Sequence, residues 1–124
     1  MRKVDKKILA IDDDLNMDKM LVFLFETRGY EIQFADNGED ALELLKSFKP
    51  DLVILDLLMP GMNGFEVCEK IKSDADSKQI PVIVLSALPA EIHEERARSL
   101  GVFDYLEKPF SSKELLEKAE EAIG

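Results

Sequence analysis

The strongest constraint on the fold is an alternation of short apolar runs with longer segments of helical periodicity. Apolar runs occupy residues 8–11, 52–55 and 81–85, and residues 31–35 alternate between polar and apolar side chains. Residues 103–106 form a further short strand candidate. Strands that are apolar on both faces require a parallel sheet that helices cover on both sides. The pattern therefore predicts a parallel sheet.

A segment with helical spacing of apolar residues follows each run. The predicted helices cover residues 15–28, 39–48, 65–73, 90–100 and 113–123. Gly29 and Gly101 follow the first and the fourth of them, where a left-handed residue often ends a helix. Five strand–helix repeats fill the chain, so we expect a doubly wound α/β domain with helices on both faces of the sheet.

Length, charge and cysteine content restrict the function. The 124 residues fit one domain, which we expect to cover 1–124 with a core of about 6–123. The net charge of −10 argues against direct contact with nucleic acid or with anionic membranes. The single cysteine, Cys68, cannot form an intrachain disulfide, and no apolar run approaches the ~20 residues that span a bilayer. We therefore expect a cytoplasmic protein without membrane insertion.

Polar side chains stand where the apolar runs end. Residues 12–14 are three aspartates, Asp56 follows the run 52–55, and Ser86 and Lys108 follow two later runs. Each has an ordinary explanation by itself, such as capping of the next helix by an aspartate. Together they indicate one site, because the carboxyl ends of parallel strands meet at one edge of the sheet, where ligands bind.

These residue types favour one kind of chemistry. Clustered carboxylates repel each other unless a cation neutralises them, and a set of oxygen ligands without clustered His or Cys favours Mg²⁺, with Mn²⁺ able to replace it. A lysine and a serine hydroxyl suit phosphoryl oxygens. A carboxylate can itself be the nucleophile and form an aspartyl-phosphate. The pattern predicts Mg²⁺-dependent phosphoryl transfer to a carboxylate.

Four segments in order resemble the receiver domain of two-component response regulators. They are an acidic cluster after a strand, a phosphoacceptor signature, a strand that ends in a hydroxyl and a small residue, and a strand with a lysine–proline pair, at residues 8–14, 50–64, 81–87 and 103–110. The resemblance covers nearly the whole chain. It implies a flavodoxin-like fold with a five-stranded parallel sheet in the order 2-1-3-4-5.

The same resemblance implies a role for each residue of the acidic part of the site. Asp56 is expected to be the phosphorylated nucleophile and a metal ligand. Asp13 is expected to bind Mg²⁺ directly, and Asp12 mainly through water. The main-chain carbonyl of Leu58 is expected to supply a further ligand.

The remaining site residues are expected to contact the phosphoryl group and to report its presence. Lys108 would pair with the phosphoryl group, and Ser86 would donate a hydrogen bond to it. Tyr105 matches the aromatic residue whose rotamer follows the state of that hydroxyl, so Ser86 and Tyr105 would form the switch. The peptide bond between Lys108 and Pro109 is expected to be cis.

The implied function is a regulatory phosphoacceptor that catalyses only its own phosphorylation and dephosphorylation. Its phosphoryl donor would be a histidine kinase or a histidine phosphotransfer domain. Its output would be a changed surface formed by the fourth helix, fifth strand and fifth helix, read by an effector protein that the sequence does not name. We expect a monomer or a phosphorylation-dependent dimer.

Three other interpretations remain open. A Mg²⁺-dependent phosphohydrolase also places an aspartate nucleophile after a strand, but typically has an acid two residues later, where this chain has Leu58. An interaction module that never needs phosphate would not require the complete set of polar residues. The chain could also be the receiver part of a longer response regulator.

Overall fold

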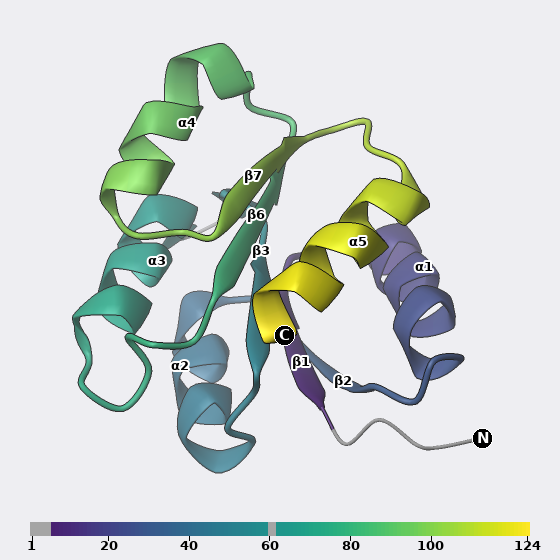
Figure 1. The fold of residues 1–124 in the computed structure, drawn as a ribbon. Helices are drawn as coiled ribbons and strands as arrows, with labels where there is room; N and C mark the ends of the chain where they lie inside the picture. The colour runs from purple at the N-terminus through teal and green to yellow at the C-terminus, as the bar shows by residue number, and fades with distance from the viewer. Residues whose placement is uncertain (1–5, 60–61) are drawn as a thin grey trace.

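The structure, a computed structural model, describes residues 6–59 and 62–124. A five-stranded sheet runs through its middle in the order β2-β1-β3-β6-β7, and all neighbouring strands are parallel (Figure 1). The strands are β1 (Lys7–Ile11), β2 (Glu31–Ala35), β3 (Leu52–Leu55), β6 (Val82–Ser86) and β7 (Asp104–Glu107). Counted as strands one to five of the sheet, this is the order 2-1-3-4-5, so the predicted flavodoxin-like α/β fold is confirmed.

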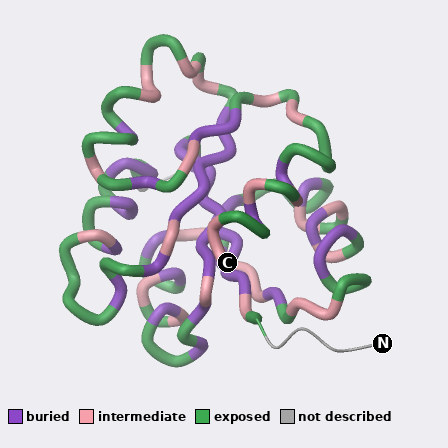
Figure 2. The backbone as a smooth tube through the Cα atoms, viewed as in Figure 1, coloured by how far each residue is buried: buried purple, intermediate pink, exposed green. Residues whose placement is uncertain are grey.

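Helices cover both faces of the sheet. They are α1 (Leu15–Glu26), α2 (Gly38–Ser47), α3 (Gly64–Ser73), α4 (Ala90–Ser99) and α5 (Ser112–Ile123). α1 and α5 pack on one face and α2, α3 and α4 on the other, so the buried residues form a middle layer (Figures 1 and 2). Within residues 6–59 and 62–124, no helix has the length and apolar character needed to cross a membrane.

Side-chain alternation in the central strands divides the core into two clusters. In β1, Ile8 and Ala10 belong to the cluster under α1 and α5, whereas Leu9 and Ile11 belong to the cluster under the other three helices. All four side chains are fully buried. Burial of apolar surface on both faces is the main stabilising contribution to such a sheet. It explains why the runs in the sequence are apolar without interruption.

The helix starts are fixed by side-chain caps. The Asp14 carboxylate accepts hydrogen bonds from the backbone N–H groups of Asn16 (2.9 Å) and Met17 (3.3 Å) at the start of α1. Asn37 caps α2 and Ser111 caps α5 in the same way. Each such cap contributes about 1 kcal/mol to stability. The capping interpretation is therefore correct for Asp14, which leaves its two acidic neighbours without that explanation.

Two local features differ from the sequence prediction. α1 ends at Glu26 rather than at residue 28, because Arg28 and Gly29 donate backbone hydrogen bonds three residues back and tighten the last turn. The segment between β3 and α3, for which no strand was predicted, contains a short antiparallel pair, β4 (Leu58–Met59) and β5 (Met62–Asn63). The boundaries of the other predicted elements agree with the structure to within one residue.

Cys68 on α3 is expected to resist alkylation while the domain is folded. Its side chain is 1% exposed, and burial raises the pKa of its thiol to about 11, against a lowering influence of Lys72. Iodoacetamide labelling followed by mass spectrometry should give slow modification at neutral pH and rapid modification in denaturant. Because the pKa is higher in the folded state, stability should fall as the pH rises from about 9 towards 11. Labelling of the native protein at the rate of a free thiol would contradict this expectation.

Candidate functional site

The acidic residues of the site are held by hydrogen bonds that extend the sheet ladder. Ile11 of β1 is in register with Leu55 of β3, so the residues that follow them emerge side by side. The backbone N–H of Asp12 donates to the Ala35 carbonyl (3.0 Å), and that of Asp56 donates to the Ile11 carbonyl (2.9 Å). The sheet itself therefore brings the two carboxylates to the same edge, as predicted.

The lysine side of the site is held in the same way. Ser86 is the last residue of β6 and is in register with Glu107 of β7. The backbone N–H of the next residue, Lys108, donates to the Ser86 carbonyl at 2.7 Å. The Lys108–Pro109 peptide bond is cis, as the resemblance implied.

Asp56 and Lys108 form an ion pair across the sheet edge. The distance between Lys108 Nζ and Asp56 Oδ2 is 3.0 Å, and the Asp56 side chain is only 6% exposed. The other oxygen of Asp56, Oδ1, accepts the backbone N–H of Leu58 at 2.9 Å. A buried carboxylate needs such charge-assisted partners. The pair fixes the direction of the carboxylate and places a cation beside it.

Asp12 is buried with one oxygen unsatisfied. Its Oδ1 accepts the backbone N–H of Asp14 (2.9 Å), but none of the residues that the structure describes donates a hydrogen bond to its Oδ2. Burial, a side-chain hydrogen bond with Asp18, and the negative charges of Asp18 and Asp56 raise the pKa of Asp12 to about 8, against the lowering effect of the Asp14 N–H. A positive charge bound beside Asp12 would favour its ionised form.

The oxygens at this edge fit a hard cation such as Mg²⁺. Asp12 supplies a buried oxygen to which no described residue donates a hydrogen bond. After burial and Asp18, the negative charge of Asp56 also contributes to the raised pKa of Asp12. Asp13, the next residue along the chain, is exposed. No three Asp, Glu, His or Cys side chains of the described residues gather into a complete metal-binding group. The fit therefore depends on main-chain carbonyl groups and water for the remaining ligands, which is usual for Mg²⁺.

The predicted switch residues are linked through one loop. The Ser86 hydroxyl is fully buried and accepts the backbone N–H of Leu88 at 3.1 Å. Tyr105 is 5% exposed, and its hydroxyl donates to the Leu88 carbonyl at 2.8 Å. Ser86 therefore binds the backbone N–H of Leu88, and Tyr105 binds the carbonyl of the same residue.

Glu107 also belongs to this region, although its place in the sequence did not indicate this. A Glu107 carboxylate oxygen accepts the backbone N–H of Ala90, the first residue of α4, at 2.7 Å. Pro89 occupies the cap position of α4 and makes no side-chain cap bond. The lack of a capping residue before α4 was the available signal, but nothing in the sequence indicated that the cap comes from β7.

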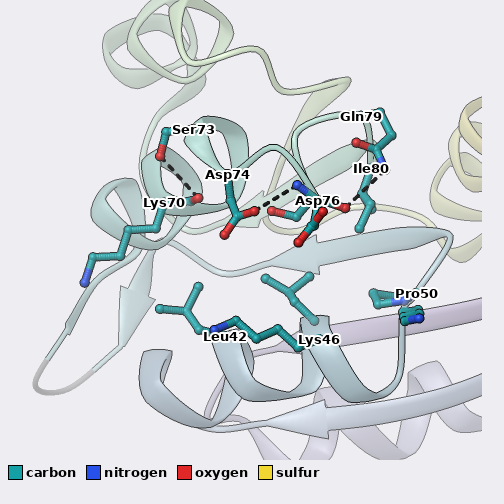
Figure 3. A pocket seen from close by; sticks show the side chains of 12 residues that line it. Leu42, Lys46, Pro50, Lys70, Ser73, Asp74, Asp76, Gln79 and Ile80 are labelled. Carbon is teal, nitrogen blue, oxygen red and sulfur yellow. Dashed lines mark hydrogen bonds between the residues drawn. The ribbon is translucent and has the colours of Figure 1, made fainter.

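A pocket of about 960 Å³ lies at the opposite end of the strands (Figure 3). Pro50 and Ile80, which precede β3 and β6, are among its lining residues, together with Lys46 of α2. Asp74 in its wall already accepts the backbone N–H of Asp76 at 2.8 Å. Because Pro50 and Ile80 precede β3 and β6, the pocket is separate from the cluster at the carboxyl ends of these strands.

Comparison with known proteins agrees with this arrangement. The family model of the response regulator receiver domain matches residues 8–120. A putative response regulator from Chloroflexus aurantiacus is 30% identical with a TM-score of 0.90, and the match covers 97% of this chain and 98% of that one. The chemotaxis protein CheY4 of Vibrio cholerae is 27% identical with a TM-score of 0.88, with 96% and 99% of the chains covered.

A third similar structure is the receiver domain of a sensor histidine kinase from Pseudomonas aeruginosa, which holds a magnesium ion in its active-site cleft. It is 23% identical with a TM-score of 0.86, and the match covers 98% of this chain and 99% of that one. Receiver domains are phosphoacceptor modules of two-component signalling that work with histidine kinases or phosphotransfer domains. With the family model matching residues 8–120 and the fold shared over nearly its full length, this chain belongs to the response regulator receiver domain family.

Proposed function

We propose that this receiver domain is switched by phosphorylation of Asp56. The observation that carries the proposal is the buried Asp56 carboxylate paired with Lys108 at 3.0 Å, with the buried Asp12 at the end of the neighbouring strand. A carboxylate that is fixed in direction beside a cation is arranged for attack on phosphorus. The lysine can then stabilise the charge on the phosphoryl oxygens.

The proposed cation is Mg²⁺, held by Asp12, Asp13, Asp56 and the Leu58 carbonyl. Two of the carboxylates follow neighbouring strands, and the backbone N–H of Leu58 already bonds to Asp56. When bound, Mg²⁺ neutralises charge on the phosphoryl group during transfer. The four ligands are all oxygen atoms, as this cation prefers.

The proposed transfer moves one phosphoryl group from a phosphohistidine to this chain. A carboxylate oxygen of Asp56 forms the new O–P bond as the N–P bond breaks, and the bonding electrons stay on the histidine nitrogen. Lys108 Nζ turns from the carboxylate towards the phosphoryl oxygens. Ser86 accepts a hydrogen bond from Leu88, so its own hydroxyl hydrogen can be donated to another phosphoryl oxygen.

The signal is proposed to leave through the loop that joins β6 to α4. Ser86 and Tyr105 both bond to Leu88, and Glu107 holds the start of α4. A phosphoryl group that binds Ser86 and Lys108 would therefore change the hydrogen bonds that position this loop. We propose that it shifts the population of loop and helix positions rather than creating a new fold.

The surface that would change is tied together by ion pairs. Asp104 of β7 bonds to Arg98 of α4 at 2.9 Å and to Lys118 of α5 at 3.2 Å. One carboxylate thus joins the two helices across the strand between them. An effector protein that binds α4, β7 and α5 would sense a change in the position of α4 relative to this junction.

A protein donor is supported by exposed apolar side chains on α1 and in the segment after β3. Leu15, which begins α1 directly after the acidic residues, is 75% exposed, and Leu58 is 50% exposed. Phe23, further along α1, is 74% exposed. We propose that a histidine kinase or a phosphotransfer domain contacts these side chains. The phosphohydrolase interpretation is not favoured, because the position two residues after Asp56 holds this exposed leucine rather than an acid.

Substitution of Asp56 by asparagine is expected to abolish phosphorylation. The protein is incubated with Mg²⁺ and a small acyl phosphate, and its intact mass is measured. The parent should gain one phosphoryl group, and a chelator should prevent the gain. Asp76→Asn is the control, because Asp76 is exposed in the loop after α3 and should label like the parent. Equal labelling of Asp56→Asn and parent would overturn the proposal.

A further inference from the structure

Helix α4 is attached to the domain by few buried side chains. Of its ten residues, all of which the structure describes, only Ala97 is buried. On the side of β7, a Glu107 carboxylate oxygen accepts the backbone N–H of Ala90 at 2.7 Å, and Arg98 pairs with Asp104 at 2.9 Å. A helix that buries so little apolar surface depends on individual contacts of this kind for its position.

A separate contact joins α4 to the neighbouring helix α3. The Arg96 guanidinium lies over the face of the Phe65 ring, with its Cζ 4.0 Å from the ring centroid. The centroid of the His93 ring, about one turn earlier on the same face of α4, lies 6.1 Å from that of Phe65. Phe65 is 5% exposed, so its ring is part of the packed domain. The attraction between a cation and an aromatic face therefore fixes this side of α4 against α3.

Phe65 is in turn held close to the segment that follows Asp56. Its backbone N–H donates to the Asn63 side chain at 2.8 Å, and the N–H of Gly64 donates to the Leu57 carbonyl at 3.2 Å. A Cβ atom at position 64 would collide with Leu57 Cα, so the start of α3 fits tightly against that backbone. The contact between α3 and α4 is therefore one residue away from a direct backbone contact with the segment of Asp56.

We infer that Arg96 is a positioning residue, which restrains α4 through Phe65 and thereby opposes phosphorylation of Asp56. This inference rests on the proposed function. It adds a second connection between the site and α4, through the start of α3, to the one through the loop after β6. Arg96 acts through the Phe65 ring and has no catalytic role.

The direction of the effect follows from the arrangement to which the contact belongs. Here Lys108 Nζ lies 3.0 Å from Asp56 Oδ2. A phosphoryl group on Asp56 would separate these two groups, and the proposed function expects α4 to shift when this happens. A contact that fixes α4 makes that shift less favourable. Because coupling between two sites is reciprocal, loss of the contact should make phosphorylation more favourable.

The test compares Arg96→Gln and Phe65→Leu with the parent, by intact mass during phosphorylation with Mg²⁺ and an acyl phosphate. Each variant should be phosphorylated about fivefold faster, a factor that corresponds to about 1 kcal/mol, the size of one exposed cation–π contact. The double variant should be no faster than either single variant, because both substitutions remove the same contact. Hydrogen–deuterium exchange of residues 90–99 should be faster in all three variants.

Two further variants separate the contact from a general effect of charge. Arg96→Lys should lie closer to the parent than Arg96→Gln does, because an ammonium group is also attracted to a ring face. Lys70→Gln is the matched control, since Lys70 is exposed on α3 and its substitution removes the same charge. Loss of a positive charge alone disfavours the approach of an anionic donor, so this control should be no faster than the parent.

Rates of Arg96→Gln and Phe65→Leu that equal or fall below that of the parent would overturn the inference and leave phosphorylation of Asp56 intact. A double variant that shows the product of the two single effects would also overturn it. Arg96 is exposed, so its variants decide the question even if Phe65→Leu does not fold. A parent that takes up no phosphoryl group would instead overturn the proposed function together with the inference.

Discussion

Alanine at position 64 is expected to destabilise the domain by about 3 kcal/mol or more. Gly64 begins α3 and lies directly against the backbone that follows β3. A Cβ atom there would collide with Leu57 Cα and would lie 2.9 Å from the carbonyl oxygens of both Asp56 and Leu57. These are backbone atoms, which cannot rotate away as the end of a side chain can. The substitution must therefore displace either α3 or the segment that carries Asp56.

The matched control for this prediction is Gly101→Ala. Gly101 has a left-handed backbone with φ of +91°, but a Cβ atom there would meet only Lys72 Cδ at 3.9 Å. Its cost should be about 1 kcal/mol from the backbone conformation alone. Urea unfolding of the two variants and the parent measures both values. If Gly64→Ala were as stable as Gly101→Ala, α3 would not approach the backbone of Leu57 as closely as described.

Replacing Lys108 by alanine is expected to slow phosphorylation by an acyl phosphate about 100-fold, the usual effect of removing one preorganised donor from a transition state. The ammonium group lies 3.0 Å from Asp56 Oδ2 and is the cation that we expect to meet the incoming phosphoryl oxygens. Without it, Asp56 keeps its bond from the Leu58 N–H but loses its charged partner. The rate should be measured by intact mass at saturating Mg²⁺, so that altered cation affinity does not contribute.

Lys113→Ala serves as the control for the loss of a positive charge. Lys113 is exposed in the first turn of α5, and its removal should leave the labelling rate within about twofold of the parent, as for surface substitutions in general. Lys108→Arg tests geometry at constant charge and should recover only part of the rate, because a planar guanidinium does not occupy the position of an ammonium group. A Lys108→Ala variant that labels as fast as the Lys113 variant would exclude the proposed role.

Much of the architecture could be predicted because local sequence patterns reflect burial. The runs at 8–11 and 52–55 are buried along their whole length, since they become β1 and β3 in the middle of the sheet. Parallel pairing then places the residues that follow these strands at one edge. The approach of Asp12, Asp56 and Lys108 to one another follows from this topology without knowledge of any side-chain contact.

The contacts that the sequence did not reveal depend on the relative position of whole elements. Burial and the neighbouring Asp18 of α1 raise the pKa of Asp12, and no local pattern in the sequence indicates this influence. Glu107 caps α4 from a different strand, which no local capping pattern could indicate. The pair β4 and β5 is only two residues long on each side, too short for a strand period to be visible. Each of these features depends on how two segments are placed relative to each other, which side-chain periodicity does not encode.

Reductive trapping of the phosphorylated chain tests the role of Asp56 most directly. An acyl phosphate on an aspartate is reduced by borohydride to homoserine, whereas phosphate esters of serine or tyrosine are not. After phosphorylation with Mg²⁺ and an acyl phosphate, peptide mass spectrometry should find homoserine at position 56 and unchanged aspartate at positions 12 and 13. Homoserine at another aspartate, or a labelled protein without any homoserine, would contradict the assignment of Asp56 as the phosphoacceptor.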